Sequence, residues 1–184
     1  MNDVMNDADA RMAKSVEATR EDFATIRAGR ANPAMFAKIT ADYYGTQTPL
    51  QQLASFTSQD ARTILIQPFD IGAMGSIEKA IRDSDLGVNP ANDGKVLRCV
   101  FPELTEERRK EFIKLARSKA EEGRVSVRNV RRTAKQGLEK LEKDGEVGKD
   151  DVTGAEKRLD ALTKTHTDKI DEMLKHKEAE LLEV

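Results

Sequence analysis

Basic side chains gather in one stretch of the sequence, and their type and spacing point to contact with a polyanion. Residues 108–135 contain eleven Lys and Arg residues and three acidic ones, a net charge of +8 in a chain whose total charge is −2. At 100° per residue on a helix, six of these side chains fall within a sector of about 60°. We call them the basic row: Lys110, Arg117, Arg124, Arg128, Arg131 and Lys135. Arginine predominates in this row, and its planar guanidinium group suits phosphates and exposed bases.

The competing interpretation of the basic row is a solvated helix face balanced by nearby acids. Of the three acidic residues in this stretch only Glu121 falls near the row, so pairing within the helix cannot neutralise it, although acids on other helices could. We expect the guanidinium groups to stay open to water, with their counter-charges on another molecule. Engagement by carboxylates of flanking helices would remove this anchoring surface. Because a helix cannot enter the RNA major groove, recognition would be of backbone and shape.

The residue types needed for catalysis are scarce. The chain has two histidines, His166 and His176, and one cysteine, Cys99, and it lacks the phosphate-loop, dinucleotide-binding, zinc-protease and hydrolase motifs. His166 lies on an apolar helix stripe, which favours a hydrogen-bonded core histidine, and Cys99 alternates with apolar strand residues, which favours a buried structural thiol. We therefore predict a binding protein rather than an enzyme, with no cofactor and no metal site.

Composition favours long helices around a slender core. Charged residues make up 35% of the chain and aromatic residues 4%, and there is no tryptophan. No run of 18 apolar residues occurs, and the first residues lack the basic and apolar segments of a secretory signal. These features predict a cytoplasmic protein without a membrane span.

Three long helices are predicted on either side of a different central segment. The first covers residues 5–27, the second runs from Thr105, a helix-capping residue, to about 144, and the third follows a reversal at Gly145 and Gly148. Gly123 and Gly137 lie on or beside the apolar seam of the second helix, which indicates either close approach of a neighbouring helix or a bend. The apolar stripe of the first helix consists of Met12, Val16, Thr19, Phe23 and Ile26. That of the second consists of Phe112, Ala116, Ala120, Val127, Val130, Ala134 and Leu141. That of the third consists of Val152, Leu159, Leu162, His166, Ile170, Met173 or Leu174, and Leu181.

Residues 31–104 have another character, since they hold all five prolines and both tyrosines. Short alternating or β-branched runs at 38–43, 62–67 and 96–101 predict strands, and helical spacing at 74–81 predicts one helix. The predicted fold is therefore α+β: an antiparallel three-helix bundle from residues 1–30 and 105–184, with a small β/α/β domain inserted at 31–104. The two short crossings, stiffened by Pro33 and Pro102, permit a hinge.

Two other classes of protein fit the same residues. A coiled-coil scaffold or chaperone-like protein would continue its seams into other copies of the chain, whereas the bundle needs only a monomer. A nonspecific DNA-binding helical protein would use the basic row on any duplex, which the acidic remainder of the chain disfavours.

Several stretches together resemble the bacterial ribosome recycling factor family. They are residues 29–33, 42–50 with 52–54, 84–90, 104–110, 124–132 and 177–182, and they cover essentially the whole chain in matching order. The resemblance implies an L-shaped, tRNA-like outline. It also implies that the protein, with elongation factor G and GTP, splits the post-termination ribosome into subunits and frees messenger and tRNA.

The resemblance further implies where each part acts. The bundle would bind large-subunit rRNA, with Arg109, Arg128, Arg131 and Arg132 carried over by motif, and the inserted domain would face elongation factor G. The hinge would fall on Arg30, Ala31, Leu104 and Thr105. Together with the basic row, the rRNA-binding candidates are Arg109, Lys110, Arg117, Arg124, Arg128, Arg131, Arg132 and Lys135.

Overall fold

The contacts of the chain divide it into two compact units. The computed structural model describes residues 1–183. The first unit comprises Met1–Phe23 and Ile113–Ala179, and the second comprises Ala24–Phe112 and the residues from Glu180 onward. The predicted domain boundaries, near residues 30–31 and 104–105, lie inside the second unit and stay a prediction.

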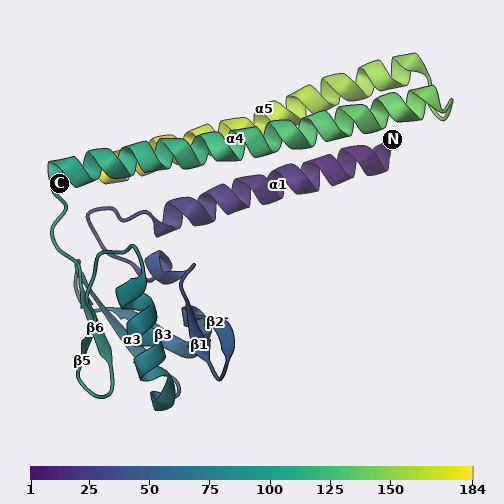
Figure 1. The fold of residues 1–184 in the computed structure, drawn as a ribbon. Coiled ribbons are helices and arrows are strands. Elements are labelled where there is room, and N and C mark those ends of the chain that lie inside the picture. Colours follow the sequence, from purple (N-terminus) through teal and green to yellow (C-terminus); the bar gives the residue numbers. More distant parts are fainter. Residues whose placement is uncertain (184) are drawn as a thin grey trace. The chain divides into compact units, whose positions relative to one another are not determined.

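Three long helices build the first unit (Figure 1). They are α1 (Asn2–Thr25), α4 (Glu106–Lys143) and α5 (Lys149–Leu182). A short turn reverses the chain between α4 and α5, and Gly145 adopts a φ of +74° there, in the left-handed region that glycine tolerates. The antiparallel bundle predicted from the apolar stripes is thus confirmed.

The bundle is held together by one apolar seam on each helix, and most of its side chains are small. The buried residues recur mostly at steps of three and four: Ala8, Met12, Val16, Thr19 and Phe23 on α1; Ala116, Ala120, Gly123, Val127, Val130, Ala134 and Leu138 on α4; Val152, Ala155, Leu159, His166 and Ile170 on α5. Leu138, which was not predicted, is fully buried in the seam of α4, whereas the predicted Leu141 is half-buried. A strict seven-residue repeat drifts around a straight helix of 3.6 residues per turn, so the contact moves to a neighbouring position.

At Gly123, side chains of α1 and α5 both approach the backbone of α4 closely. A Cβ atom built at this position would clash with Thr19 Oγ1 of α1 and would lie 3.1 Å from Ile170 Cδ1 of α5. The helix α4 continues without interruption through this point for 38 residues. Of the two explanations for the glycine, close approach is therefore confirmed.

His166 is a core histidine, as its position on the apolar stripe predicts. Its side chain is 4% exposed, and its Nε2 atom lies 2.8 Å from Asp9 Oδ1 of α1. The pair links α5 to α1 across the bundle.

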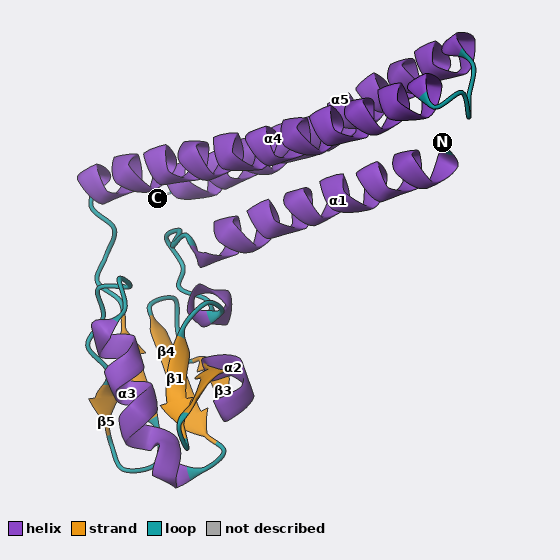
Figure 2. Ribbon diagram, turned by 45° about the vertical axis from the view of Figure 1, so that its right-hand side comes forward, coloured by secondary structure: helices purple, strands orange, loops and turns teal. Residues whose placement is uncertain are grey.

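The second unit contains a small antiparallel sheet and a hairpin. The sheet has the order β3 (Ala54–Ser58), β4 (Thr63–Pro68), β6 (Leu97–Val100), β5 (Ala91–Asn92), and the hairpin joins β1 (Thr40–Tyr43) to β2 (Thr46–Pro49). Helix α3 (Met74–Asp83), the single turn α2 (Leu50–Leu53) and the 3-10 turns η1 (Pro33–Phe36) and η2 (Ile71–Ala73) complete it (Figure 2). The strands β1, β4 and β6 and the helix α3 were predicted. The sequence analysis missed β2, β3 and β5, because β2 and β5 are short and mostly polar and β3 has only two apolar residues, Ala54 and Phe56.

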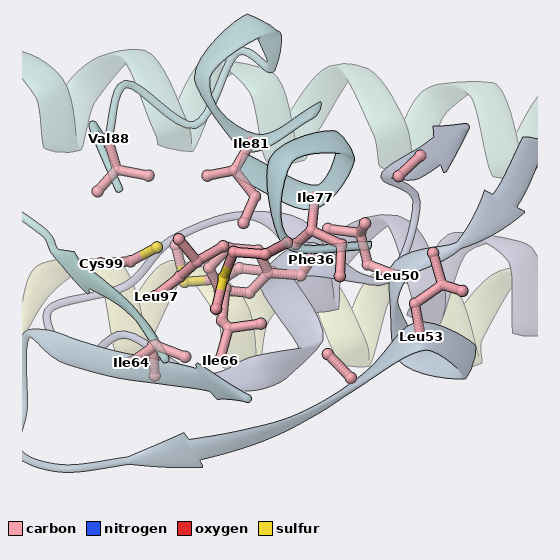
Figure 3. Close-up of a cluster of buried hydrophobic side chains, with 14 of the residues drawn as sticks. Phe36, Leu50, Leu53, Ile64, Ile66, Ile77, Ile81, Val88, Leu97 and Cys99 are labelled. Atoms are coloured by element: carbon pink, nitrogen blue, oxygen red, sulfur yellow. The ribbon is translucent and has the colours of Figure 1, made fainter. Parts of the chain in front are cut away.

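The core of this unit lies between α3 and the sheet (Figure 3). Ile77 and Ile81 of α3 pack into one cluster with Ile64, Ile66 and Leu97 of the sheet. Cys99 belongs to the same cluster, and burial raises the pKa of its thiol to about 11. The thiol is therefore protonated at neutral pH, and the predicted structural role of Cys99 is confirmed.

Among residues 1–183, none of the helices is both long enough and apolar enough to cross a bilayer. The same residues hold no group of three or more His, Cys, Asp and Glu side chains placed to bind a metal ion.

Substituting Gly123 tests the close packing of the bundle. Gly123→Ala gains helix propensity but forces a methyl group against Thr19, which should cost about 1–3 kcal/mol of overpacking. Gly154→Ala is the matched control, because a Cβ there meets nothing within 4 Å. It should stabilise the protein by up to about 1 kcal/mol. Chemical denaturation of both variants measures the difference. Equal stability of the two variants would contradict the close approach at Gly123.

Candidate nucleic-acid interface

The basic row runs along α4, which begins with the cap predicted from the sequence. The backbone N–H of Arg108 donates to Thr105 Oγ1 at 3.2 Å, and Glu106 and Glu107 follow in the first turn, where the helix dipole favours acids. The buried seam occupies another face of the helix, so most side chains of the row reach the surface while α4 stays packed.

Three arginines of the basic row are engaged by carboxylates of α5, which corrects the expectation that the row is open. Arg117 Nε lies 2.6 Å from Glu178 Oε1, and Arg131 Nε lies 2.7 Å from Asp160 Oδ1. Arg124 Nε lies 3.4 Å from Asp171 Oδ1. The physical reason is the close packing of the bundle, which brings an acidic face of α5 within reach of α4.

The side chain of Arg124 is mostly buried. Its side chain is 20% exposed, and it also lies 3.5 Å from Glu121 Oε2. Its Nη1 atom is buried and has no hydrogen-bond partner among the described residues. Arg124 is thus positioned to hold α4 and α5 together rather than to reach another molecule.

The carboxyl-terminal end of the row is more available. Arg128 pairs only within its own helix, with Nη1 at 3.2 Å from Glu121 Oε1, and more than half of its side chain is exposed. Within residues 1–183, neither Arg132 nor Lys135 makes an ion pair. Arg132 is exposed and Lys135 is half-buried.

The pair between Arg131 and Asp160 is weak enough to exchange. Both side chains are more than a third exposed, and ion pairs at that exposure contribute about 0.2–1 kcal/mol. A backbone phosphate carries the same single negative charge as a carboxylate and accepts two parallel hydrogen bonds from a guanidinium group in the same way, so it can take the place of Asp160. The carboxylate partner of Arg117 is less exposed, because the side chain of Glu178 is 26% exposed and that of Asp160 is 59% exposed.

Arg109 and Lys110 belong to the second unit and have other partners. Arg109 Nη1 donates to the carbonyl oxygen of Leu181 at 3.0 Å and also to that of Glu183. Arg109 therefore holds Leu181 and Glu183 against the first turns of α4. Lys110 Nζ lies 3.2 Å from Glu106 Oε1, and both side chains are largely exposed.

The four predicted hinge residues lie between elements of regular structure. Arg30 and Ala31 follow α1, and Leu104 and Thr105 precede α4. Ala31 is almost fully buried, and its backbone N–H donates to the carbonyl of Ala61 at 2.8 Å. Ala31 is thus tied to the second unit, whereas Arg30 and Thr105 are exposed.

The sequence did not single out the acids that face the basic row. Asp160, Asp171 and Glu178 are spaced by eleven and seven residues and so share one face of α5. That spacing was available, but many other acids lie on the same helix, and only packing decides which of them face α4.

The sequence also did not single out Arg27 as a buried charged residue. It is buried, and its guanidinium carbon lies 5.5 Å from the centre of the Phe101 ring. Burial lowers the pKa of Arg27, and the nearby charges of Arg62, Arg108 and Arg109 lower it further.

The chain is similar to known proteins over its whole length. Residues 19–182 match the family model described as ribosome recycling factor. A ribosome-recycling factor of a Nocardioides species is 78% identical over 184 residues, the whole of both chains, and that of Acidothermus cellulolyticus is 62% identical over the same span.

Two solved structures are also similar. A solution structure of ribosome recycling factor has a TM-score of 0.77 at 39% identity, covering 100% of this chain and 97% of its own. The second has a TM-score of 0.67 at 42% identity over 99% and 98% of the two chains. It describes the T. thermophilus ribosome recycling factor and the E. coli elongation factor G bound to the E. coli post-termination complex. This chain belongs to the ribosome recycling factor family.

Proposed function

We propose that this protein splits the post-termination ribosome into subunits together with elongation factor G and GTP, releasing messenger and tRNA. The observation that carries the proposal is the 78% identity to a ribosome-recycling factor over the whole length of both chains. A relative described together with elongation factor G on the post-termination complex supports the choice of partners. The protein acts as a monomer in the cytoplasm and catalyses no reaction of its own.

The bundle is proposed to anchor the protein on large-subunit rRNA through α4. Arg132 and Lys135 are free of ion pairs among the described residues, and Arg128 and Arg131 can exchange exposed carboxylates for phosphates. These four residues are the main contacts, with Lys110 beyond them. Arg109, Arg117 and Arg124 already have firm partners within the protein, so we assign them a smaller share of the binding.

The hinge is proposed to turn this anchor into movement. With the bundle held on rRNA, elongation factor G displaces the inserted domain about Arg30, Ala31, Leu104 and Thr105. GTP energy then becomes a displacement at the bridges between the subunits. Support comes from the position of these four residues outside helices and strands, with Arg30 and Ala31 after α1 and Leu104 and Thr105 before α4.

Sedimentation of post-termination ribosomes tests the function directly. Subunits should appear when this protein, elongation factor G and GTP are all present, and omission of any one should leave the complex intact. Splitting without this protein, or none with all three, would refute the proposal.

The anchoring role predicts a graded response to substitution. Arg131→Ala or Arg132→Ala should weaken ribosome binding and lower the salt dependence by about one counterion each, with stability changed by less than about 1 kcal/mol. Asp160→Asn should strengthen binding, because it releases Arg131. Titration of labelled protein onto large subunits at several salt concentrations measures both effects.

The control for these variants is Arg158→Ala on α5, because Arg158 is exposed and outside the basic row. It should leave binding nearly unchanged. If Arg131→Ala binds like the parent protein while remaining folded, Arg131 is not a contact.

The lever makes a separate prediction about the hinge. A short Gly-Ser insertion between Leu104 and Thr105 lengthens one crossing by flexible residues that transmit force poorly. Affinity for large subunits should stay the same, whereas the rate of subunit splitting, followed by light scattering, should fall. An unchanged splitting rate would argue against a lever.

A further inference from the structure

The three most exposed large apolar residues of the described part of the chain adjoin Asp70, two of them in the sequence and one through a hydrogen bond. They are Tyr44, at 84% exposure, Phe69, at 70%, and Ile71, at 67%. Phe69 and Ile71 flank Asp70 in the sequence, and the Tyr44 hydroxyl donates to Asp70 Oδ2 at 3.4 Å. We call these three side chains and Asp70 the Asp70 patch. Clustered exposed apolar residues mark surfaces that bind other molecules.

Hydrogen bonds to Asp70 organise this patch in advance. Its Oδ2 also accepts from the Tyr43 hydroxyl at 3.0 Å, and its Oδ1 accepts from the backbone N–H of Gly72 at 2.9 Å. The β1–β2 turn is thereby tied to the segment between β4 and α3. These hydrogen bonds, that from Gly72 first, lower the pKa of Asp70, which keeps it ionised. A surface ordered before contact loses less entropy on binding.

The backbone conformation of Tyr44 is a second observation that points to a functional role. Tyr44 and Gly45 form the two-residue turn between β1 and β2, with φ values of +49° and +83°. Such turns favour Asn-Gly or Gly-Gly, and a bulky residue at positive φ is strained. The exposed ring of Tyr44 contacts that of Tyr43, whose centre lies 4.6 Å away, and its hydroxyl donates to Asp70. A strained backbone conformation that presents a largely exposed ring is typical of a functional surface.

The charge of the patch selects the class of partner. Residues 42–47 and 68–73, which carry the patch, contain Asp42 and Asp70 and no Lys or Arg. Two carboxylates repel the phosphates of RNA, whereas an aromatic and aliphatic centre suits the core of a protein interface. The chemistry is opposite to that of the basic row on α4. The partner is therefore a protein with an apolar site bordered by Lys or Arg.

We propose that Tyr44, Phe69 and Ile71, arranged by Asp70, are the surface on which elongation factor G engages this protein. The assignment rests on the proposed function, which makes elongation factor G the protein partner that acts during splitting. Exposed aromatic side chains are frequent hot spots of such interfaces.

Two variants and a control test the surface. Tyr44→Gly removes the ring and relieves the positive φ, so it should fold at least as stably as the parent protein. Phe69→Ser removes the second ring. Each should raise the concentration of elongation factor G needed for half-maximal splitting by about tenfold or more. Val100→Ser is the matched control, because Val100 is an exposed apolar residue of β6 outside the patch, and it should have no effect.

The possible outcomes of this experiment separate the docking surface from the proposed function. Parental dependence on elongation factor G in both variants overturns the docking surface and leaves the proposed function standing. Loss of ribosome binding without elongation factor G also overturns it, because the patch would then face the ribosome. Failure of the parent protein to split ribosomes refutes the proposed function itself.

A photo-crosslinking residue at position 69 gives a readout that does not need splitting. On ribosomes with elongation factor G and a GTP analogue, it should crosslink to elongation factor G. Crosslinks only to RNA or to a ribosomal protein would overturn the proposal.

Discussion

The close approach of three helices at Gly123 is the constraint on which the first unit depends. With no side chain at this position, α1 and α5 both come within contact of the α4 backbone, and small residues such as Ala116 and Ala120 keep the seam narrow along its length. A narrow seam gives a slender bundle with few aromatic residues, as the composition indicates. The same closeness also brings the acids of α5 within ion-pair distance of the arginines of α4.

These ion pairs between α4 and α5 affect how the basic row can bind a polyanion. A row with all its counter-charges on another molecule would attract any polyanion strongly. In this protein Arg117, Arg124 and Arg131 have carboxylate partners, so a phosphate that bound any of them would have to displace a carboxylate of α5. Exchange of this kind favours a surface whose phosphates match the spacing of the side chains, and it disfavours indiscriminate binding. An overall net charge of −2 acts in the same direction.

The basic row and the Asp70 patch are chemical opposites, and each suits a different class of macromolecule. The available end of the basic row offers charge-assisted hydrogen bonds to a phosphate backbone. The Asp70 patch offers exposed rings and an aliphatic side chain around an ionised carboxylate. The proposed function needs this difference, because like chemistry on both surfaces would allow either proposed partner to bind at the wrong one.

Local sequence patterns determined the three long helices, three of the strands and the apolar face of each long helix. Steps of three and four residues predicted the seams of α1, α4 and α5, and β-branched runs stopped by proline predicted β4 and β6. The clustering of Arg and Lys on α4 and the resemblance to ribosome recycling factors also came from the sequence alone. Tertiary structure decided which acids of α5 meet Arg117, Arg124 and Arg131, and which exposed residues gather around Asp70. The physical reason is that helical and strand periods report only the orientation of a side chain relative to its own element. Contacts between elements depend on packing distances and rotations that residues far apart in the chain set together.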